Sequence, residues 1–573
     1  MNFHIRHILI VIILALTLNL NLEGQLSLID DDNNLYQVID RATTIHPSLE
    51  YHTAVHYGSR LEVLKLTAQL DTMSWLSKLD RVEWRQAKYS VPERRAIDAP
   101  WKTDMDTVNR KAGFLGAFYK DPYTFWEVNV PDFFLAINPV LNLSMGNSDG
   151  GKRIFQNTRG IKIRGVIDQK IYFYSSLYET QRRYPSYIDA EIDRINAIPG
   201  QGFYKLYDSS ILGGISGYDF LNGQAYAGTK ISKSIDLQFG HGRHFIGDGI
   251  RSLLLSDYSH NYFYLRLSTK IWKFHYQNIF AELAAASGKD AIGNELLPKK
   301  YMSAHYLDFE VSDRLTIGLF ESVIYGRDNG LELQYLNPVI LYRTVEQMLD
   351  SPDNVLLGLN IKWIPRKRWQ LYGQLMVDEL KTSQAFNGSG WWGNKIAYQV
   401  GTKIFNVLGV DHLDIQIEHN TARPYTYAHR INNISDRPVG SYSHYNQSLA
   451  HPYGANFRET IFQVRYRPSA KIWVDARYIR SYYGDDLNGQ NFGRNILEDY
   501  ETRTQDFENE TGQGLRRDIN IIHGSIAYEL MPNTYLDLNL MIRRQSTGAV
   551  NNPSLNYIGL GLRMNMGKED LDF

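Results

Sequence analysis

The sequence predicts an all-β transmembrane protein, an antiparallel outer-membrane β-barrel of about 16–18 strands with a short N-terminal helical segment. Three observations lead to this fold class. The chain begins with an apolar run too short to cross a bilayer, residues from 111 onward alternate between apolar and polar, and short turns alternate with long polar loops. An exported chain without a membrane-spanning helix is either soluble or a β-barrel, so the strands decide between the two.

Residues 1–24 predict a cleaved signal peptide. Arg6 gives a weakly basic start, residues 8–18 form the apolar run, and the polar Asn19 and Asn21 end it. This run is shorter than the ~20 residues of a membrane-spanning helix, so a short membrane anchor is the less favoured alternative.

Residues 25–110 predict a helical segment on the periplasmic side. Residues 35–43 and 59–84 carry apolar side chains at helical spacing. The residues that could line one face are Leu61, Leu64, Leu66, Leu70, Met73, Leu76 and Leu79. Such a segment could plug the barrel or cap its periplasmic end, and the sequence leaves both open.

Residues 111–573 predict the barrel. In 535–543, the apolar residues Leu536, Leu538 and Leu540 alternate with Asp537 and Asn539. The same pattern recurs in 263–271, 356–363, 412–419 and 557–566. Alternation of this kind gives a strand one apolar and one polar face, which the wall of a transmembrane barrel needs.

The lengths of the connections favour a barrel over a soluble β-protein. The short connections are 168–169, 232–234, 312–313, 365–368, 467–471 and 532–533. The long ones, rich in Gly, Asn and Tyr, are about 182–222, 284–302, 326–354, 379–394, 420–458 and 483–517. A β-sandwich or a β-propeller would explain the alternating strands but not short turns on one rim and long loops on the other.

Composition excludes several classes of function. With 61 basic and 62 acidic residues, the net charge of −1 gives no general attraction to nucleic acid. The chain has no cysteine, which excludes disulfides, Cys-ligated zinc and thiol nucleophiles. Its 39 tyrosines suit strands, interfaces and sugar contacts, because tyrosine has an apolar body and a polar tip.

Motifs for catalysis or cofactor binding are weak or missing. The glycines of 240–249 do not complete a dinucleotide fingerprint, because Phe245 stands where G-x-G-x-x-G needs its third glycine. His241, His244 and Asp248 could be drawn as a metal cluster, but their spacing matches no ligand pattern. H-E-x-x-H and G-x-S-x-G are absent. We therefore expect no enzyme activity, no cofactor and no metal, although an outer-membrane hydrolase stays an alternative.

Four loops combine aromatic rings with polar groups, as carbohydrate sites do. They are 216–226, 387–394, 441–447 and 481–495. Extracellular loops are often rich in Tyr, Asn and Gly, so the mixture alone leaves polysaccharide contact and plain loop composition equally open.

Three stretches carry a resemblance to a known family. GRHFIGDGIRSLLLSDYSHNYFYLRL (242–267) resembles the signature block of the Wzi capsule-assembly family of outer-membrane proteins. FESVIYGRDNGLELQYLNPVILYR (320–343) resembles that family's E-x-x-x-Y segment leading to a Tyr-Leu-x-Pro turn, and NLYQVIDRA (34–42) resembles the leading helix of its Bacteroidetes branch, which includes RemB-type gliding-motility proteins. The glycines of 242–249 are then best interpreted as a tight turn feeding a barrel strand, followed by leucines that face lipid or packed loops.

The resemblance implies a monomeric barrel in the cell outer membrane that binds or organises surface (capsular) polysaccharide. A RemB-like role in gliding motility is the alternative, and a porin-like channel a further one. The partners so implied are outer-membrane lipid, surface polysaccharide and proteins of motility or surface assembly, with no nucleic acid. We expect a lumenal network under the mouth, made of ligand contacts or of structural pairs, from Arg243, Asp248, Arg251, Glu321, Tyr325, Glu332 and Tyr335.

Overall fold

The computed structural model describes residues 26–29, 33–56, 58–71, 73, 76–95, 123–148, 151–209, 215–287, 296–327, 330–385, 387–431, 438–548, 550–570 and 572–573. The predicted signal peptide and the predicted boundary between 110 and 111 lie outside the described residues.

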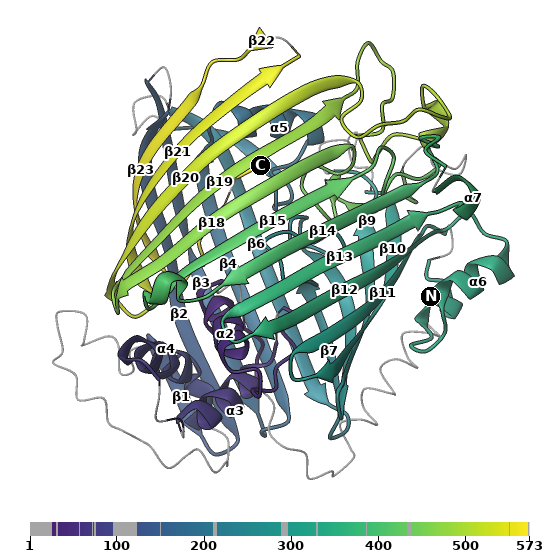
Figure 1. Cartoon of the computed structure of the whole chain (residues 1–573). Coiled ribbons are helices and arrows are strands. Elements are labelled where there is room, and N and C mark those ends of the chain that lie inside the picture. Colours follow the sequence, from purple (N-terminus) through teal and green to yellow (C-terminus); the bar gives the residue numbers. More distant parts are fainter. Residues whose placement is uncertain are drawn as a thin grey trace.

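The chain forms a closed antiparallel barrel of 18 strands, as the alternating pattern predicted (Figure 1). Pairing of the first wall strand with the last, from Leu141 opposite Met564 to Asn147 opposite Ile558, closes the wall. The wall strands are β2 (Phe133–Ser148), β3 (Lys152–Ile167), β4 (Ile171–Arg183), β6 (Ile215–Lys230), β7 (Ile235–Gly242), β8 (Tyr262–Ile271), β9 (Phe274–Ala284), β10 (Lys299–Ser312), β11 (Leu315–Tyr325), β12 (Asn354–Arg366), β13 (Trp369–Glu379), β14 (Lys395–Ile404), β15 (Leu413–Ala422), β18 (Phe457–Ser469), β19 (Ile472–Asp485), β20 (Leu515–Met531), β21 (Thr534–Thr547) and β23 (Leu555–Met564).

Three further strands add to wall strands, and two form a small hairpin. The added strands are β1 (Trp126–Val130) on β2, β5 (Tyr204–Ser209) on β6 and β22 (Val550–Asn551) on β21. The hairpin pairs β16 (Ser443–His444) with β17 (Gln447–Ser448) inside a long loop.

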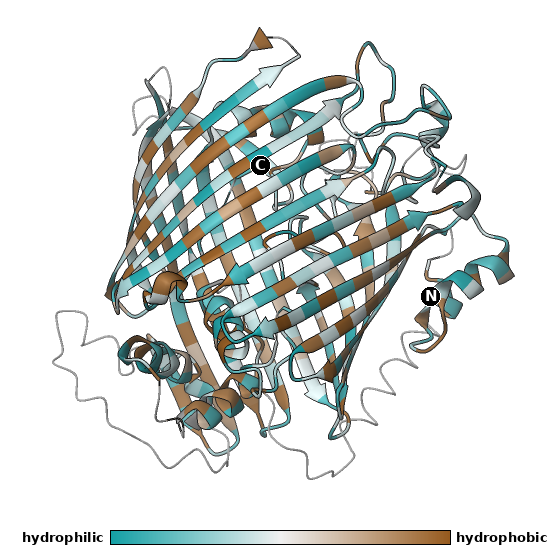
Figure 2. Ribbon diagram, viewed as in Figure 1, coloured by the Kyte–Doolittle hydropathy of each residue, from teal (hydrophilic) through white to brown (hydrophobic). Residues whose placement is uncertain are grey.

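The outer face of the wall is apolar, and the inner face is mainly polar. On β21, Leu536, Leu540 and Ile542 are exposed on the outside, whereas Tyr535 and Arg543 are buried on the inside. Apolar and polar residues alternate in the same way along the neighbouring strands (Figure 2). An apolar band around a closed antiparallel barrel is the mark of a transmembrane barrel, so this outer face is the lipid-facing side.

The two rims differ as the sequence predicted. One rim has short turns, such as 168–170 between β3 and β4 and 532–533 between β20 and β21. The other carries the long connections, including 423–456 and 486–514. By the usual asymmetry of such barrels, the short-turn rim is periplasmic and the long loops form the outer mouth.

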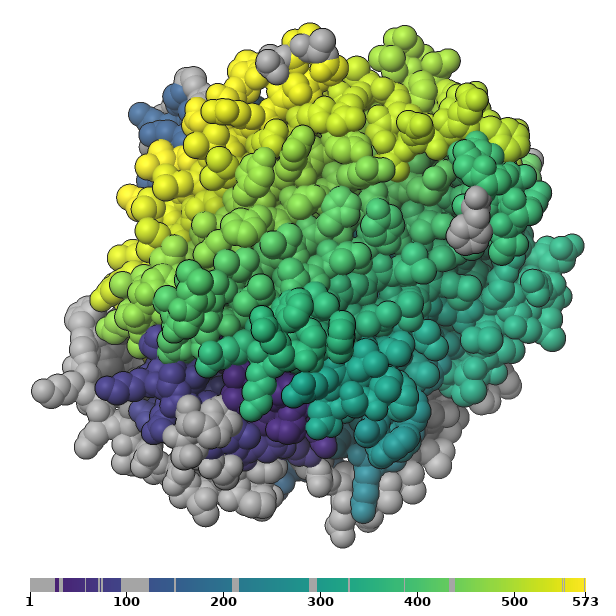
Figure 3. Space-filling model, viewed as in Figure 1, coloured from purple at the N-terminus to yellow at the C-terminus, as the bar shows by residue number. Residues whose placement is uncertain are grey.

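Helices α2 (Asn33–Ile45), α3 (Arg60–Asp71) and α4 (Lys78–Tyr89) and the 3-10 turn η1 (Pro92–Arg95) gather at the periplasmic rim, in purple in Figure 3. The apolar pattern of 59–84 is divided between α3 and α4, because Ser77 and Asp80 form a capping box that begins α4. Ile39, Leu66 and Trp84 lie in one buried cluster that joins the three helices.

The N-terminal segment both caps and plugs the barrel. Its helices cap the periplasmic end, where Arg41 donates to Asp414 at 2.8 Å. Residues 51–56 enter the lumen, where Thr53 donates to Asp248 at 2.5 Å and Val55 forms a β-bridge with Ile246.

The remaining helical pieces belong to the connections between strands. They are α5 (Ser186–Ile195), η5 (Leu333–Leu336), α6 (Tyr342–Leu349), α7 (Thr382–Ala385), η6 (Val407–Gly409) and η7 (Tyr500–Thr502). Among the described residues, we find no helix with the length and hydropathy needed to cross a membrane.

Candidate functional site

The connection between β7 and β8, residues 243–261, turns into the lumen and meets the wall at very short range. A Cβ on Gly249 would lie 2.6 Å from an oxygen of Glu418, and Gly247 has a positive φ of 153° with Gln374 at 2.5 Å from its would-be Cβ. Glycine is needed at both positions, because any larger residue would push the loop off the wall. The glycines are therefore a tight turn against the wall, as the sequence indicated.

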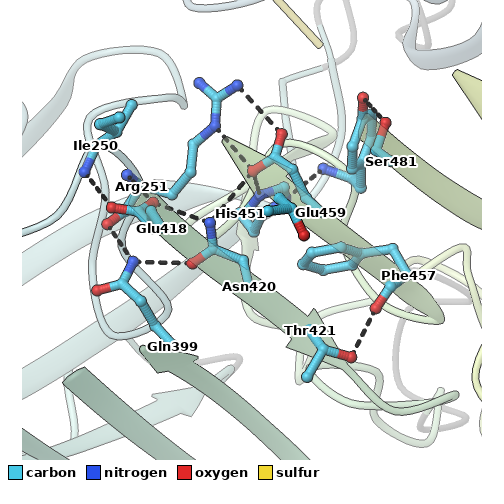
Figure 4. Close-up of polar contacts among 12 residues, drawn as sticks. Ile250, Arg251, Gln399, Glu418, Asn420, Thr421, His451, Phe457, Glu459 and Ser481 are labelled. Atoms are coloured by element: carbon cyan, nitrogen blue, oxygen red, sulfur yellow. Dashed lines mark hydrogen bonds and ion pairs between the residues drawn. The ribbon is translucent and has the colours of Figure 1, made fainter. Parts of the chain in front are cut away.

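A carboxylate on the wall holds this turn by its backbone (Figure 4). Glu418, on β15, accepts hydrogen bonds from the backbone N–H of Ile250 at 2.6 Å and of Arg251 at 3.0 Å. It also accepts from Tyr372 at 2.7 Å and Asn420 at 2.8 Å, so its buried charge is fully hydrogen-bonded.

Arg251 joins the turn to the wall and to the C-terminal tail. Its guanidinium contacts both oxygens of Glu459 at 3.3 Å and donates to the carboxylate of Asp572 at 3.0 Å. Glu459 is also paired with His451 at 2.8 Å (Figure 4). Arg251, Glu459 and Asp572 lie far apart in sequence and form one buried ion network.

The tail after β23 folds up inside the barrel. Arg477 on β19 pairs with Asp570 at 2.8 Å and also with Asp572, and Lys568 donates to Ser525 at 2.8 Å. Burial opposes ionisation of Asp572, but Arg251 and Arg477 outweigh it and hold the pKa of this carboxyl at about 2. The terminal Phe573 is buried, with its ring 5.6 Å from that of Tyr258. The tail is therefore part of the plug.

Asp248 and Arg243 complete the lumenal part of the predicted set. The carboxylate of Asp248 accepts from Thr53 at 2.5 Å and from Asn360 at 3.1 Å, so it joins the N-terminal segment to the wall. Arg243 donates to the carbonyl of Asp257 at 2.9 Å and lies next to a cavity of about 520 Å³. That cavity lies among the α2 region, the β7–β8 loop, the tail and the wall.

The leucines after the glycine turn pack inside the barrel and do not face lipid. Leu253, Leu254 and Leu255 are fully buried in a cluster that runs from Val55 to Phe573. Tyr427 and Tyr442 from the 423–456 loop cover them and donate to the carbonyls of Leu253 and Leu254 at 2.8 and 2.7 Å. One core across the lumen is thus shared by four segments: the N-terminal segment, the β7–β8 loop, the 423–456 loop and the C-terminal tail.

The expectation that Glu321, Tyr325, Glu332 and Tyr335 belong to the lumenal network is wrong. On β11, the side chain of Phe320 faces the lumen, because its cross-strand partner Gly358 packs against Leu254 of the lumenal β7–β8 loop. Every second residue of β11 counted from Phe320 faces the lumen with it. Glu321 and Tyr325 therefore face outward, and Tyr335 packs on Tyr325 from the outside, with ring centroids 4.9 Å apart.

The ion pairs of this outer group lie within the 326–353 loop. Arg327 forms a two-pronged pair with Asp353 at 2.7 and 2.6 Å and contacts Glu332 at 3.5 Å, and Tyr335 donates to Asp353 at 2.8 Å. Tyr335 therefore holds the loop on the outer wall through Tyr325, and Glu332 pairs within the loop with Arg327.

The residues considered for a metal do not converge. His241 contacts the carbonyl of Gly223 at 3.1 Å, His244 contacts Tyr262 at 3.2 Å, and Asp248 is engaged as above.

A second group, which the sequence analysis did not predict, lies at the periplasmic rim. One potential ligand atom from each of Asp80, Glu83 and His412 lies within 4.8 Å of the other two. Arg467 pairs with Glu83 at 2.7 Å and Arg41 lies 3.6 Å from Asp80, so two arginines already neutralise these carboxylates. The triad is better suited to joining the cap to the wall than to holding a cation.

An aromatic and cationic cluster forms at the outer mouth, where the predicted sugar-type stretch 387–394 meets residues 500–506, which lie beyond the predicted stretch 481–495. Trp392 and Tyr500 lie with ring centroids 4.9 Å apart, and the backbone N–H of Trp392 donates to Asp506 at 2.9 Å. The Arg503 guanidinium lies 4.2 Å over Trp392, and the Lys395 ammonium lies 4.0 Å over Tyr500. Trp391, Trp392, Tyr500 and Arg503 are half-buried, which leaves ring surface for a ligand. We call this group the mouth cluster.

Comparisons with known proteins bear on the fold. No family profile and no curated protein matches the sequence. Among solved structures, the chain is similar to Wzi of Escherichia coli, described as an outer-membrane protein involved in group 1 capsule assembly and as a carbohydrate-binding β-barrel. The two are 12% identical, with a TM-score of 0.56, over 94% of this chain and 100% of that one. OccK8 (OprE) of Pseudomonas aeruginosa is 11% identical over 75% of this chain and 97% of its own, with a TM-score of 0.40. At such identities the likeness to Wzi concerns the barrel fold.

Proposed function

We propose that this chain is an outer-membrane barrel that binds and organises a surface (capsular) polysaccharide at its outer mouth, without catalysis. The polysaccharide would be held among the long loops and would not pass through the barrel. Wzi, which shares the fold, is described as carbohydrate-binding, and that description supports the choice of ligand class.

The observation that carries the proposal is the filled lumen. One buried cluster reaches from Val55 through Leu254 to Tyr442 and Phe573, so residues 51–56, the C-terminal tail and two loops occupy much of the space that a channel would leave open, beside the cavity of about 520 Å³. Porin-like passage needs a water-filled lumen. A barrel filled in this way offers its loops as its working surface.

The mouth cluster supplies the chemistry that sugars need. Saccharides present apolar C–H faces to aromatic rings and hydroxyls to charged hydrogen-bonding groups. Trp391 and Trp392 offer ring surface, and Arg503 stands beside them with Glu501 at 2.9 Å and Asp506 at 2.7 Å. We place the polysaccharide contact on these residues.

The test is binding of the purified, detergent-solubilised protein to surface polysaccharide from its own organism, with unrelated polysaccharides as controls. We expect saturable, selective binding that weakens about tenfold in Trp391→Ala, the equivalent of about 1.4 kcal/mol. The matched control is Trp272→Ala, since Trp272 is a highly exposed tryptophan in the β8–β9 turn at the opposite rim. That variant should bind like the parent protein.

Two results would contradict the proposal. A folded protein, verified by heat-modifiable gel mobility, that binds no polysaccharide would instead favour the motility role, which deletion and colony spreading would then test. Steady conductance in planar bilayers would favour a channel.

A further inference from the structure

The β11–β12 connection, residues 326–353, lies outside the barrel, where Figure 1 shows α6 beside the wall. Tyr342 and Val345 of α6 are buried in a cluster with Tyr301, Val323 and Val355, which stand on the outward face of β10, β11 and β12. The connection therefore folds back along the lipid-facing surface and does not extend into the solvent above the mouth.

The wall beneath this connection carries two polar side chains, Glu321 and His305, among its apolar ones. Glu321 accepts the backbone N–H groups of Tyr342 at 2.9 Å and Arg343 at 3.0 Å, and so caps the first turn of α6. The His305 ring lies 4.0 Å from the ring of Tyr342. Leu319 shares the outward face of β11 with Glu321 and is 56% exposed. A carboxylate facing hydrocarbon is costly, and the connection covers and hydrogen-bonds it.

The connection reaches well down the lipid-facing band. Tyr276 of β9 donates to the carbonyl of Pro338 at 2.7 Å. Along the sheet, Tyr276 pairs with Leu307, Leu307 with Leu319, and Leu319 with Leu359. The Pro338 turn therefore sits on the same row of cross-strand partners as outward-facing leucines of the band.

The side of the connection that faces away from the wall exposes large apolar side chains among polar ones. Its exposed fractions are 66% for Leu333, 81% for Val339, 65% for Leu341 and 72% for Met348. Helix α6 has one face on the wall, and its opposite face exposes Met348 beside the polar Arg343, Thr344 and Gln347. The exposed apolar side chains of the connection lie next to the apolar band of β11 and β12.

We propose that residues 331–349 lie in the outer leaflet, where their exposed apolar side chains contact lipid acyl chains. The connection is then a lateral, membrane-embedded element that widens the barrel's lipid contact and covers the polar wall at Glu321. Continuity with the lipid-facing band selects acyl chains as the occupant. The role is independent of the polysaccharide proposal, because it lies on a different face.

The absence of native cysteines makes the test clean. Met348→Cys would be compared in phosphatidylcholine vesicles with Leu319→Cys, in the lipid-facing band, and Phe507→Cys, in the 486–514 loop at the mouth, where Phe507 is 49% exposed. We expect a fluorophore on Cys at 348 to be quenched by doxyl-labelled lipid as strongly as one at 319. We also expect a water-soluble maleimide to react with it about tenfold more slowly than at 507, since apolar surroundings suppress the reactive thiolate.

Two outcomes would overturn the proposal. One is reaction at 348 as fast as at 507 without lipid quenching. The other is free reaction at 348 in vesicles but protection in intact cells, which would indicate a protein partner on this face. Leu341→Cys, on the same uncovered side, repeats the measurement should the first variant fold poorly.

Discussion

Removing Arg251 should lower the free energy of unfolding, and the contacts of Arg251 set the size of the loss. Arg251→Met keeps the volume of the side chain but leaves Glu459 and Asp572 without their shared cation. Loss of one partner from a buried ion pair costs about 3–5 kcal/mol. Glu459 keeps His451 and Asn420, and Asp572 keeps Arg477, so we expect the lower end, about 3 kcal/mol.

The assay is urea unfolding of the protein in detergent micelles, with Arg516→Met as the matched control. Arg516 pairs with Asp518 at 2.9 Å, but the two side chains are 50% and 37% exposed and so are screened by solvent, and loss of the pair should cost no more than about 0.5 kcal/mol. A double variant that also carries Glu459→Gln should recover part of the loss, because it removes one orphaned charge. Equal stability of Arg251→Met and Arg516→Met would refute the reasoning.

Two further predictions concern the turn and the cap. Gly249→Ala should lower the free energy of unfolding by about 1–3 kcal/mol, because the new methyl meets Glu418, whereas Gly524→Ala, which meets nothing within 4 Å, should be neutral in the same urea titration. Burial lowers the pKa of His412, but its contact with Glu83 at 3.2 Å and the negative charges of Glu83 and Asp80 together outweigh burial and raise the pKa above 6.5. The stabilisation of the cap by His412 is therefore full below pH 6.5 and is lost as pH rises through the folded value. His412→Gln should abolish this change in the protease resistance of 33–95 between pH 6 and 9, and a persistent change would assign it elsewhere. The charged groups that face His412 are Asp80, Glu83, Arg41 and Asp411.

The wall was predictable because its signal is local. Alternation along each strand reports one apolar and one polar face, and a transmembrane barrel wall needs that difference at every strand. β21 and β23 could be found from their own residues. The glycine turn was also local, since close approach to a wall requires a missing side chain at that position.

The side on which β11 places its residues was not predictable from its own sequence. Leu319 and Val323 stand on one face with Glu321, and Phe320 and Ile324 stand on the other. Because both faces carry apolar residues, the sequence does not indicate which face turns to lipid and which to the lumen. Only the loop that packs outside explains why Glu321 can stand on the lipid side. The network of Arg251 with Glu459 and Asp572 was equally hidden, because it joins positions 208 and 321 residues apart.

The composition of the plug follows from the composition of the wall. A barrel that presents apolar residues to lipid presents mainly polar ones to its lumen, so whatever fills the lumen must hydrogen-bond to them or leave them to water. This chain fills its lumen with charged side chains placed one against another: Asp248 toward the N-terminal segment, Arg251 toward the tail, and Glu418 beneath the turn between them. A buried polar network of this kind is stable only when each member is paired, so the plug has one register and resists partial opening. A barrel closed in this specific way is suited to present its mouth loops as a rigid surface, because the segment around Val55 and the C-terminal Phe573 brace the core on which Tyr427 and Tyr442 rest.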